Sequence, residues 1–213
     1  MTTAANLLTF LALVLALAMV WRQSWPGRLR LFRAQSATLA ALAAAFGLFG
    51  QRGTLFLVAA ALLLLKVRAI PRVLLRMGAG TPARRVAPGR SSGPRLLVAG
   101  ALVPIAYAIM LPVTAAVTLP TEGAVPLAFA LALIGLFLCV TGRDALGHIL
   151  GFLVLENGIF TLALLTTHGL PGIVEVGVFL DVLVIVLIME AVVVEVRREH
   201  ASIDVDRLRE LRG

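Results

Sequence analysis

Long runs of apolar residues, separated by short polar segments, cover most of this 213-residue chain. A helix rises 1.5 Å per residue, so about 20 apolar residues cross a hydrocarbon core of roughly 30 Å. Seven windows approach or exceed that length, and Pro126 and Gly142 bound the fifth and shortest of them. The pattern predicts an all-α, polytopic integral membrane helical bundle with seven transmembrane helices at about 5–21, 33–50, 54–75, 95–118, 125–142, 145–167 and 172–196.

Basic residues gather in alternate connections between these windows. Four segments hold nearly all of them: Arg22, Arg28, Arg30 and Arg33; Arg76, Arg84, Arg85, Arg90 and Arg95, with Arg72 just inside the third span; Arg143; and Arg197, Arg198, Arg207, Arg209 and Arg212. The other connections hold only Arg52 and Glu122 as charged residues. Because cytoplasmic loops are enriched in Lys and Arg, the N-terminus is predicted outside and the C-terminus cytoplasmic.

The same pattern suggests five parts. Residues 1–76 form a three-helix transmembrane part, 77–94 a cytoplasmic linker rich in Gly, Pro, Ser and Arg, and 95–124 the fourth helix with an outer loop. Residues 125–196 form three further helices, and 197–213 a cytoplasmic tail. No Lys or Arg precedes Arg22, so residues 1–22 are predicted to be a retained span and not a secretory signal peptide.

Composition supports a membrane protein and argues against several other classes. The chain is 60% hydrophobic and 14% charged, against about 25% charged in soluble proteins. Its net charge of +8 does not indicate nucleic acid, because the basic residues lie between apolar runs without an aromatic or Gly-rich binding motif. There is no phosphate loop, nucleophile elbow or paired-His motif, and Cys139 is the single cysteine. We predict no catalytic site, cofactor or metal in this chain, and the lipid bilayer as a partner.

Ionisable side chains inside the last two windows suggest a function. Glu156, Asp181 and Glu190 lie within very apolar sequence, where a charged side chain costs roughly 2.5–3.5 kcal/mol on insertion scales. Such residues usually face a protein interior or a wet cavity and mark proton or ion pathways. Asp181 and Glu190 are nine residues apart, about 900° around a helix, so they face opposite sides. Proton transfer is the first hypothesis, and a static hydrogen bond is the alternative.

Three further residues join these candidates. Lys66 lies about twelve residues into the third span, where a buried ion pair or a relay is expected. His148 precedes Glu156 by eight residues, about 80° around the helix; it either extends a proton chain toward the cytoplasm or is simply solvated. Glu175 lies near the outer interface, where capping of a helix start is the alternative to proton transfer.

Backbone and packing signals accompany these candidates. Pro71 removes a backbone donor, which predicts a kink in the third span. Arg68 and Arg72 are expected to extend toward the membrane surface. Gly147 and Gly151 precede Glu156 at four-residue spacing, which favours close approach of another helix.

Several stretches together resemble the family of hydrogenase-4 component E, a membrane component also found in related formate hydrogenlyases. The C-terminal part is also similar to the small K subunit of respiratory complex I. The residues that carry the resemblance are Arg143 to Phe152; Leu155-Glu156-Asn157-Gly158; Val174-Glu175-Val176-Gly177 followed by Asp181; Lys66 with Pro71; Ala34-Gln35-Ser36; and the ending from Ile203 to Gly213.

The resemblance implies specific roles. Residues 125–196 would correspond to the three-helix K subunit, with Glu156 at its proton-path glutamate and Asp181 near its second, changed to Asp and slightly displaced. His148 would replace a non-ionisable polar residue, and Glu190 would be additional. Antiporter-like membrane subunits would be neighbours. Any NiFe centre, iron–sulfur clusters and quinone or ferredoxin chemistry would belong to other subunits.

These observations favour an accessory, non-catalytic membrane subunit of a complex-I-like, hydrogenase-4-type oxidoreductase in the inner (plasma) membrane of a prokaryote. It would carry protons laterally through Glu156, Asp181 and Lys66. Two alternatives stay open: a subunit of a Mrp-type cation/proton antiporter or ion-driven transporter, and a purely structural subunit that docks partners.

Overall fold

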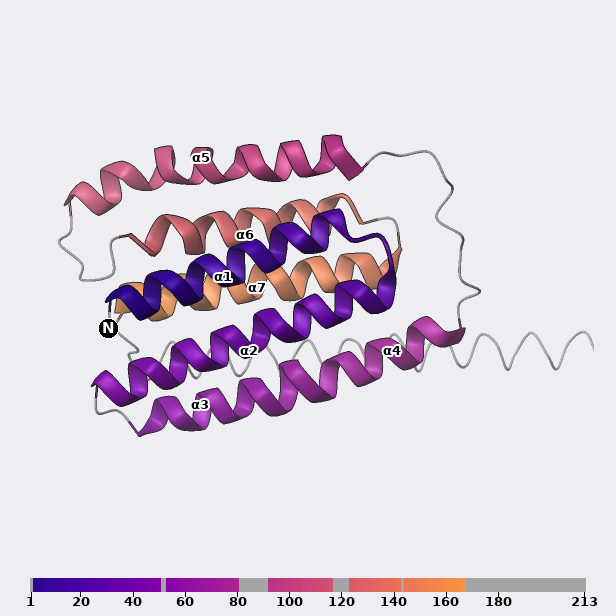
Figure 1. Ribbon diagram of the computed structural model, residues 1–213, viewed down its shortest axis with the longest axis horizontal. Helices are drawn as coiled ribbons and strands as arrows, with labels where there is room; N and C mark the ends of the chain where they lie inside the picture. The colour runs from indigo at the N-terminus through magenta and orange to yellow at the C-terminus, as the bar shows by residue number, and fades with distance from the viewer. Residues whose placement is uncertain (1, 51–52, 81–91, 117–122, 143, 168–213) are drawn as a thin grey trace, which may run out of the picture. The chain divides into compact units, whose positions relative to one another are not determined.

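The computed structural model describes residues 2–50, 53–80, 92–116, 123–142 and 144–167, all within one unit, Met1–Val178. In these ranges the chain forms helices and no strand (Figure 1). The elements are α1 (Thr2–Trp21), α2 (Trp25–Gly50), α3 (Thr54–Leu62), the π-helical segment η1 (Leu63–Ala69), α4 (Ile70–Gly80), α5 (Ser92–Ala116), α6 (Val125–Val140) and α7 (Ala145–Thr167). The all-α prediction is confirmed for this part of the chain.

Five helices among the described residues are long and apolar enough to cross a membrane. They are α1, α2, α5, α7 and the continuous stretch Thr54–Arg76 formed by α3, η1 and α4. The sixth, α6, is apolar but shorter, as expected for the shortest predicted window. The chain is therefore a helical membrane protein. The seventh predicted span, 172–196, and the tail 197–213 lie outside the described residues, so the count of seven and the direction of the termini stay predictions.

The second helix begins earlier than the hydrophobic pattern predicts. It starts at Trp25 instead of residue 33, so Arg28, Arg30 and Arg33 lie on its first turns and not in a connection. Pro26 is tolerated in a first turn, where its missing N–H would have no partner, and arginine is a good helix former. Arg28 Nε also donates to the carbonyl oxygen of Met19 at 3.2 Å. This contact ties the start of α2 to the end of α1.

The helices pack as neighbours along much of their length. α6 makes its most extensive contacts with α7, and α1 packs on α2, α5 and α6 (Figure 1). α2 in turn contacts α3 and η1. Trp25 Nε1 donates to the carbonyl oxygen of Leu74 at 3.4 Å, which joins the start of α2 to α4. α2 thus lies against both α1 and the third span.

Glycines allow α6 and α7 to approach closely. A Cβ at Gly151 would overlap the backbone of Cys139, and a Cβ at Gly158 would overlap the backbone of Ala132. On the opposite side of the interface, a Cβ at Gly135 would overlap the backbone of Leu155. Small residues permit such contacts in membranes, so the close approach predicted at Gly151 is confirmed. This packing fixes the face of α7 that carries the site.

The start of α7 is capped by a side chain. Asp144 Oδ1 accepts a hydrogen bond from the Gly147 backbone N–H at 2.6 Å, which satisfies one of the otherwise unpaired donors of a first helical turn. Gly147 lies against this cap and is not part of the α6–α7 glycine contacts described above.

Candidate functional site

The site begins with an unusual turn in the third span. Between α3 and α4 the chain forms the π-helical segment η1, and at its end the Ile70 N–H donates to the carbonyl oxygen of Leu65, five residues back. Pro71 follows directly and has no N–H to donate. The predicted distortion near Pro71 is therefore present, as a π turn immediately before the proline. Such turns are frequent at functional sites, and this one carries Lys66.

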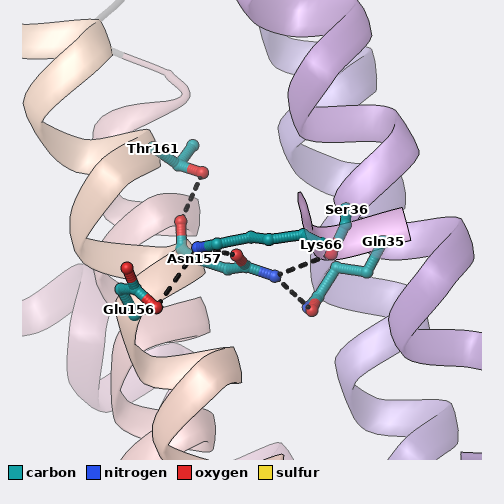
Figure 2. Close-up of polar contacts among 6 residues, drawn as sticks. All are labelled: Gln35, Ser36, Lys66, Glu156, Asn157 and Thr161. Carbon is teal, nitrogen blue, oxygen red and sulfur yellow. Dashed lines mark hydrogen bonds and ion pairs between the residues drawn. The ribbon is translucent and has the colours of Figure 1, made fainter. Parts of the chain in front are cut away.

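Lys66 extends across to α7, where it meets two consecutive residues (Figure 2). Its Nζ lies 3.3 Å from Glu156 Oε2 and donates to Asn157 Oδ1 at 2.9 Å. The Lys66 and Glu156 side chains are 1% and 6% exposed, so the charges are almost fully removed from the protein surface. Of the two roles that the sequence predicts for Lys66, a buried ion pair or a relay, the structure shows the ion pair and supplies its partner.

Two amides continue the contacts from α7 to α1. Asn157 Nδ2 donates to Gln35 Oε1 at 3.1 Å and lies 3.5 Å from Ser36 Oγ. Gln35 Nε2 then donates to the carbonyl oxygen of Ala12 at 3.1 Å. The donors therefore all point one way, from η1 through α7 and α2 to α1. We call Lys66, Glu156, Asn157, Gln35 and Ser36 the Lys66 cluster (Figure 2).

Burial and hydrogen bonds position the polar residues of the cluster. Asn157, Gln35 and Ser36 are all buried, and the Asn157 carbonyl oxygen accepts a further hydrogen bond from Thr161 Oγ1 at 2.8 Å. Gly158, next along α7, presses this turn against α6. Buried polar groups are tolerated in apolar surroundings when they are hydrogen-bonded, and the Asn157 amide, bonded to both Lys66 and Gln35, holds the Lys66 amino group in place.

The chemistry of the cluster is that of two ionisable side chains in contact. Lys66 and Glu156 can each gain or lose a proton, whereas the amides of Asn157 and Gln35 stay neutral and only orient their neighbours. The pair can exist as ammonium and carboxylate or, after proton transfer, as amine and carboxylic acid. Each charge is costly to bury alone and is stabilised by the other. A proton added or removed on one side therefore changes the preferred state of the other.

Of the remaining candidates, the structure describes only His148. His148 is exposed at the start of α7, with Nδ1 2.8 Å from the Asp144 carbonyl oxygen, and is not part of the Lys66 cluster. Arg68 and Arg72 have exposed side chains, as extension toward a membrane surface requires. Asp181, Glu190 and Glu175 lie outside the described residues, so their roles stay predictions.

A metal centre has no support in the described part of the chain. Nowhere in those ranges do three or more His, Cys, Asp or Glu side chains gather closely enough to hold an ion. The Lys66 cluster contributes an amine and two amides beside one carboxylate, and an ammonium group repels a cation. The expectation that the chain holds no cofactor stays a prediction.

Gln35, like Asn157 and Ser36, is a site residue to which the sequence assigned no role. It featured only within the Ala34-Gln35-Ser36 stretch, although it connects α7 to α1. Its signal was the adjacent polar pair Gln35-Ser36 within the largely apolar window 33–50. Polar side chains in such windows commonly face neighbouring helices, and both Gln35 and Ser36 are fully buried.

Comparisons with known proteins show one full-length relative and a group of partial ones. The chain is 39% identical over 203 residues to the uncharacterized protein Rv0085 of Mycobacterium tuberculosis, covering 94% of this chain and 92% of the relative. It is 32% identical over 81 residues to hydrogenase-4 component E of Escherichia coli K12 and of Shigella flexneri. That match covers only 38% of this chain and 38% of component E. No family model and no solved structure matches the chain.

Proposed function

The chain belongs to the same family as the uncharacterized protein Rv0085, and we propose that it is an accessory membrane subunit of a complex-I-like, hydrogenase-4-type oxidoreductase. In this proposal Lys66 and Glu156 form part of a proton path inside the membrane. Redox chemistry takes place in other subunits, and the chain itself performs no catalysis. The setting would be the inner membrane of a prokaryote, with antiporter-like membrane subunits as neighbours.

The observation that carries the proposal is the buried pair itself. Lys66 Nζ and Glu156 Oε2 lie 3.3 Å apart among apolar helices, where isolated charges are strongly disfavoured. Intramembrane pairs of this kind are typical of proton relays. A change of charge or hydration in a neighbouring subunit would bias the pair toward one protonation state. That bias is the coupling a redox-driven proton path needs.

The partial match supports the choice of assembly. Hydrogenase-4 component E is named as a component of a hydrogenase, which makes other subunits the natural place for a NiFe centre and iron–sulfur clusters. The match covers only 81 residues, so the identity of the electron-transfer partners is proposed and not inferred from the match alone. The likeness to the K subunit of complex I is also part of the proposal. So are roles in the proton path for Asp181, Glu190, Glu175 and His148.

Proton pumping by the intact complex tests this function. We would purify the complex carrying Glu156→Gln, reconstitute it in vesicles and measure protons moved per electron pair. The expected result is a large loss of protons moved per electron pair in the complexes that assemble, because an amide cannot take up a proton. Pumping at the unmodified ratio would remove Glu156 from the path. Asp144→Asn is the matched control, since it removes a carboxylate from the same helix while asparagine still caps it.

A structural role is the second candidate, favoured by the one-way series of hydrogen bonds. These hydrogen bonds, donated by Lys66, Asn157 and Gln35, join η1, α7, α2 and α1. Such cross-links between helices stabilise their packing. Under this role, Glu156→Gln lowers the yield of assembled complex but leaves the protons moved per turnover unchanged in the complexes that remain. The same experiment therefore separates the two candidates.

A further inference from the structure

Two arginines meet at the end of the bundle where α1 and α6 end and α2, α5 and α7 begin (Figure 1). Arg28 lies near the start of α2 and Arg95 near the start of α5. The two are far apart along the chain but close enough in space to repel each other electrostatically. Both side chains are partly buried. Like charges at short range are unfavourable where water is partly excluded, so the pair requires an explanation.

Neutral acceptors orient the two guanidinium groups. Arg28 Nε donates to the carbonyl oxygen of Met19, in the last turn of α1, at 3.2 Å. Arg95 Nη2 donates to Thr141 Oγ1, directly after α6, at 2.9 Å. Each of these contacts uses one of the five N–H donors that a guanidinium offers. The acceptors position the arginines but bring no negative charge to offset theirs.

A carboxylate close to the pair does not balance it. Asp144 attracts Arg28, but its Oδ1 also accepts the hydrogen bond from the Gly147 N–H that caps α7. Its side chain is exposed, where water weakens its attraction for the arginines. Arg28, Arg95 and Asp144 together therefore carry a net positive charge. A second anion at this place would offset it.

Both tryptophans of the chain lie at the same end of the bundle. Trp21 is the last residue of α1 and is exposed, and Trp25 is the first residue of α2. Tryptophan is enriched at the level of the lipid headgroups. Arg28 follows Trp25 by three residues, about 4.5 Å along the helix axis. The arginines therefore lie at the depth of the lipid phosphates, on the side predicted to be cytoplasmic.

Apolar surface continues from Arg95 along α5. Val98, Ile105 and Ile109 are each about half exposed and lie within about 80° of Arg95 around the helix. α5 also has the least buried apolar window of the candidate spans in the described ranges. A molecule with its phosphate at the arginines can therefore place a hydrocarbon chain along this face. This arrangement favours a lipid over a free phosphate ion.

We propose that Arg28 and Arg95 bind the phosphate group of an anionic phospholipid, whose acyl chains lie along α5. A planar guanidinium donates paired hydrogen bonds to phosphate oxygens, and a negative charge between two arginines offsets their repulsion. Basic pockets between transmembrane helices on the cytoplasmic side bind anionic headgroups in other membrane proteins. The site is separate from the Lys66 cluster and does not depend on the proposed function.

Lipid binding by the purified full chain tests this site. We would use native mass spectrometry in a neutral detergent to measure the affinity for phosphatidylglycerol and for phosphatidylcholine. Phosphatidylglycerol should bind at least about tenfold more tightly, because choline cancels the negative charge of the phosphate. Arg28→Gln and Arg95→Gln should each weaken phosphatidylglycerol binding at least about tenfold, since each removes charge-assisted hydrogen bonds. Equal affinity for the two lipids would overturn the site.

Arg30→Gln is the matched control. Arg30 is exposed and follows Arg28 by two residues, about 200° around α2, so the variant removes the same charge from another face. It should change the affinity for phosphatidylglycerol by less than about twofold. Asp144→Asn should tighten binding, because it removes a competing negative charge while asparagine still caps α7. An equal loss in Arg30→Gln and Arg28→Gln, or weaker binding by Asp144→Asn, would overturn the proposal.

Two further measurements address the source of the phosphate and the folding of the variants. Inorganic phosphate at millimolar concentration should not displace phosphatidylglycerol, and displacement would assign the site to the free ion and overturn the lipid. Melting temperatures without lipid show which variants fold. If Arg28→Gln does not, Thr141→Val keeps every charge but removes the hydroxyl that orients Arg95, and it should weaken binding at least about threefold. Unchanged binding by this variant would refute the arrangement described.

Discussion

α7 and α5 are both long enough to cross a membrane, but they are used in opposite ways. In α7, 61% of the apolar window is buried within the described bundle, against 11% in α5. α7 carries Glu156, Asn157 and Thr161 on a packed face and touches α6 through two glycines. α5 contains Pro104 and Pro112 and shows most of its apolar side chains to the surroundings.

The difference shows what apolar sequence means in a membrane protein. Lipid tails and a protein interior are equally apolar, so hydrophobicity does not say which side of a helix is packed. Polar and small residues carry that information. They mark the face of α7 that meets its neighbours, whereas the apolar surface of α5 suits lipid as well as it suits a partner protein.

The largest effect on stability is expected at the buried ion pair between Lys66 and Glu156. Lys66→Met and Glu156→Gln should each lower the free energy of unfolding by about 3–5 kcal/mol, because each leaves its partner buried without the opposite charge. The double variant should lose much less than the sum of the two. Chemical unfolding of the chain in detergent measures all three. Arg68→Met, an exposed basic residue of the same π segment, is the control, and an equal loss there would refute the distinction.

The next largest difference in stability between changes in α7 and changes in α5 is expected when a glycine is enlarged. Gly158→Leu would overlap the backbone of Ala132 in α6, and overpacking of this kind costs about 1–3 kcal/mol or more. Gly100→Leu in α5 has no atom within 4 Å of its added Cβ and should be neutral. Melting temperatures of the two variants provide the comparison. If Gly158→Leu melts like the unmodified chain, α6 and α7 are not packed as closely as described.

A smaller effect is expected at the start of α7. Asp144→Ala removes the cap on the Gly147 N–H and should cost about 1 kcal/mol, whereas Asp144→Asn should cost almost nothing. Unfolding curves of the two variants distinguish capping from a role of the charge. Similar losses in both would point to the charge.

The smallest effect is expected on the exposed face of α5. Leu97 and Val98 are 76% and 50% exposed, so Leu97→Ala and Val98→Ala should change the stability of the isolated chain by less than about 0.5 kcal/mol. In the proposed complex, the same two variants test whether a partner protein covers this face. A loss of assembly without a loss of chain stability would identify this face as a contact with a partner protein.

For the described residues the sequence predicted helix positions well, since a helix of membrane length leaves a clear apolar run. It missed the start of α2 because the basic turns containing Arg28, Arg30 and Arg33 are helical without being apolar. It anticipated a buried ion pair at Lys66 but did not name Glu156 as the partner, which is 90 residues away along the chain. Gln35 and Asn157 are 122 residues apart, and hydropathy carries no information about which faces of two distant helices meet.

The π turn could not be predicted from apolarity either. Pro71 indicated a disturbance, but the widened turn precedes it, from Leu63 to Ala69. Thr9 of α1 is fully buried, and its hydroxyl has no hydrogen-bond partner within the described ranges; the sequence did not indicate this, because Thr9 resembles other threonines in apolar windows. Only the geometry shows that its hydroxyl does not bond its own backbone.

The widened turn at Leu63–Ala69 also sets the chain's tolerance to changes of length. A π turn amounts to one surplus residue within an α-helix, and each residue accounts for about 100° of rotation. Removing a single residue there would let the helix return to regular winding with its two halves keeping their relative direction, whereas a deletion in a regular stretch would rotate one half against the other by that angle. Lys66 lies within the turn, so such a deletion would change its direction while the arginines of α4 keep theirs, although no ionisable group had been deleted.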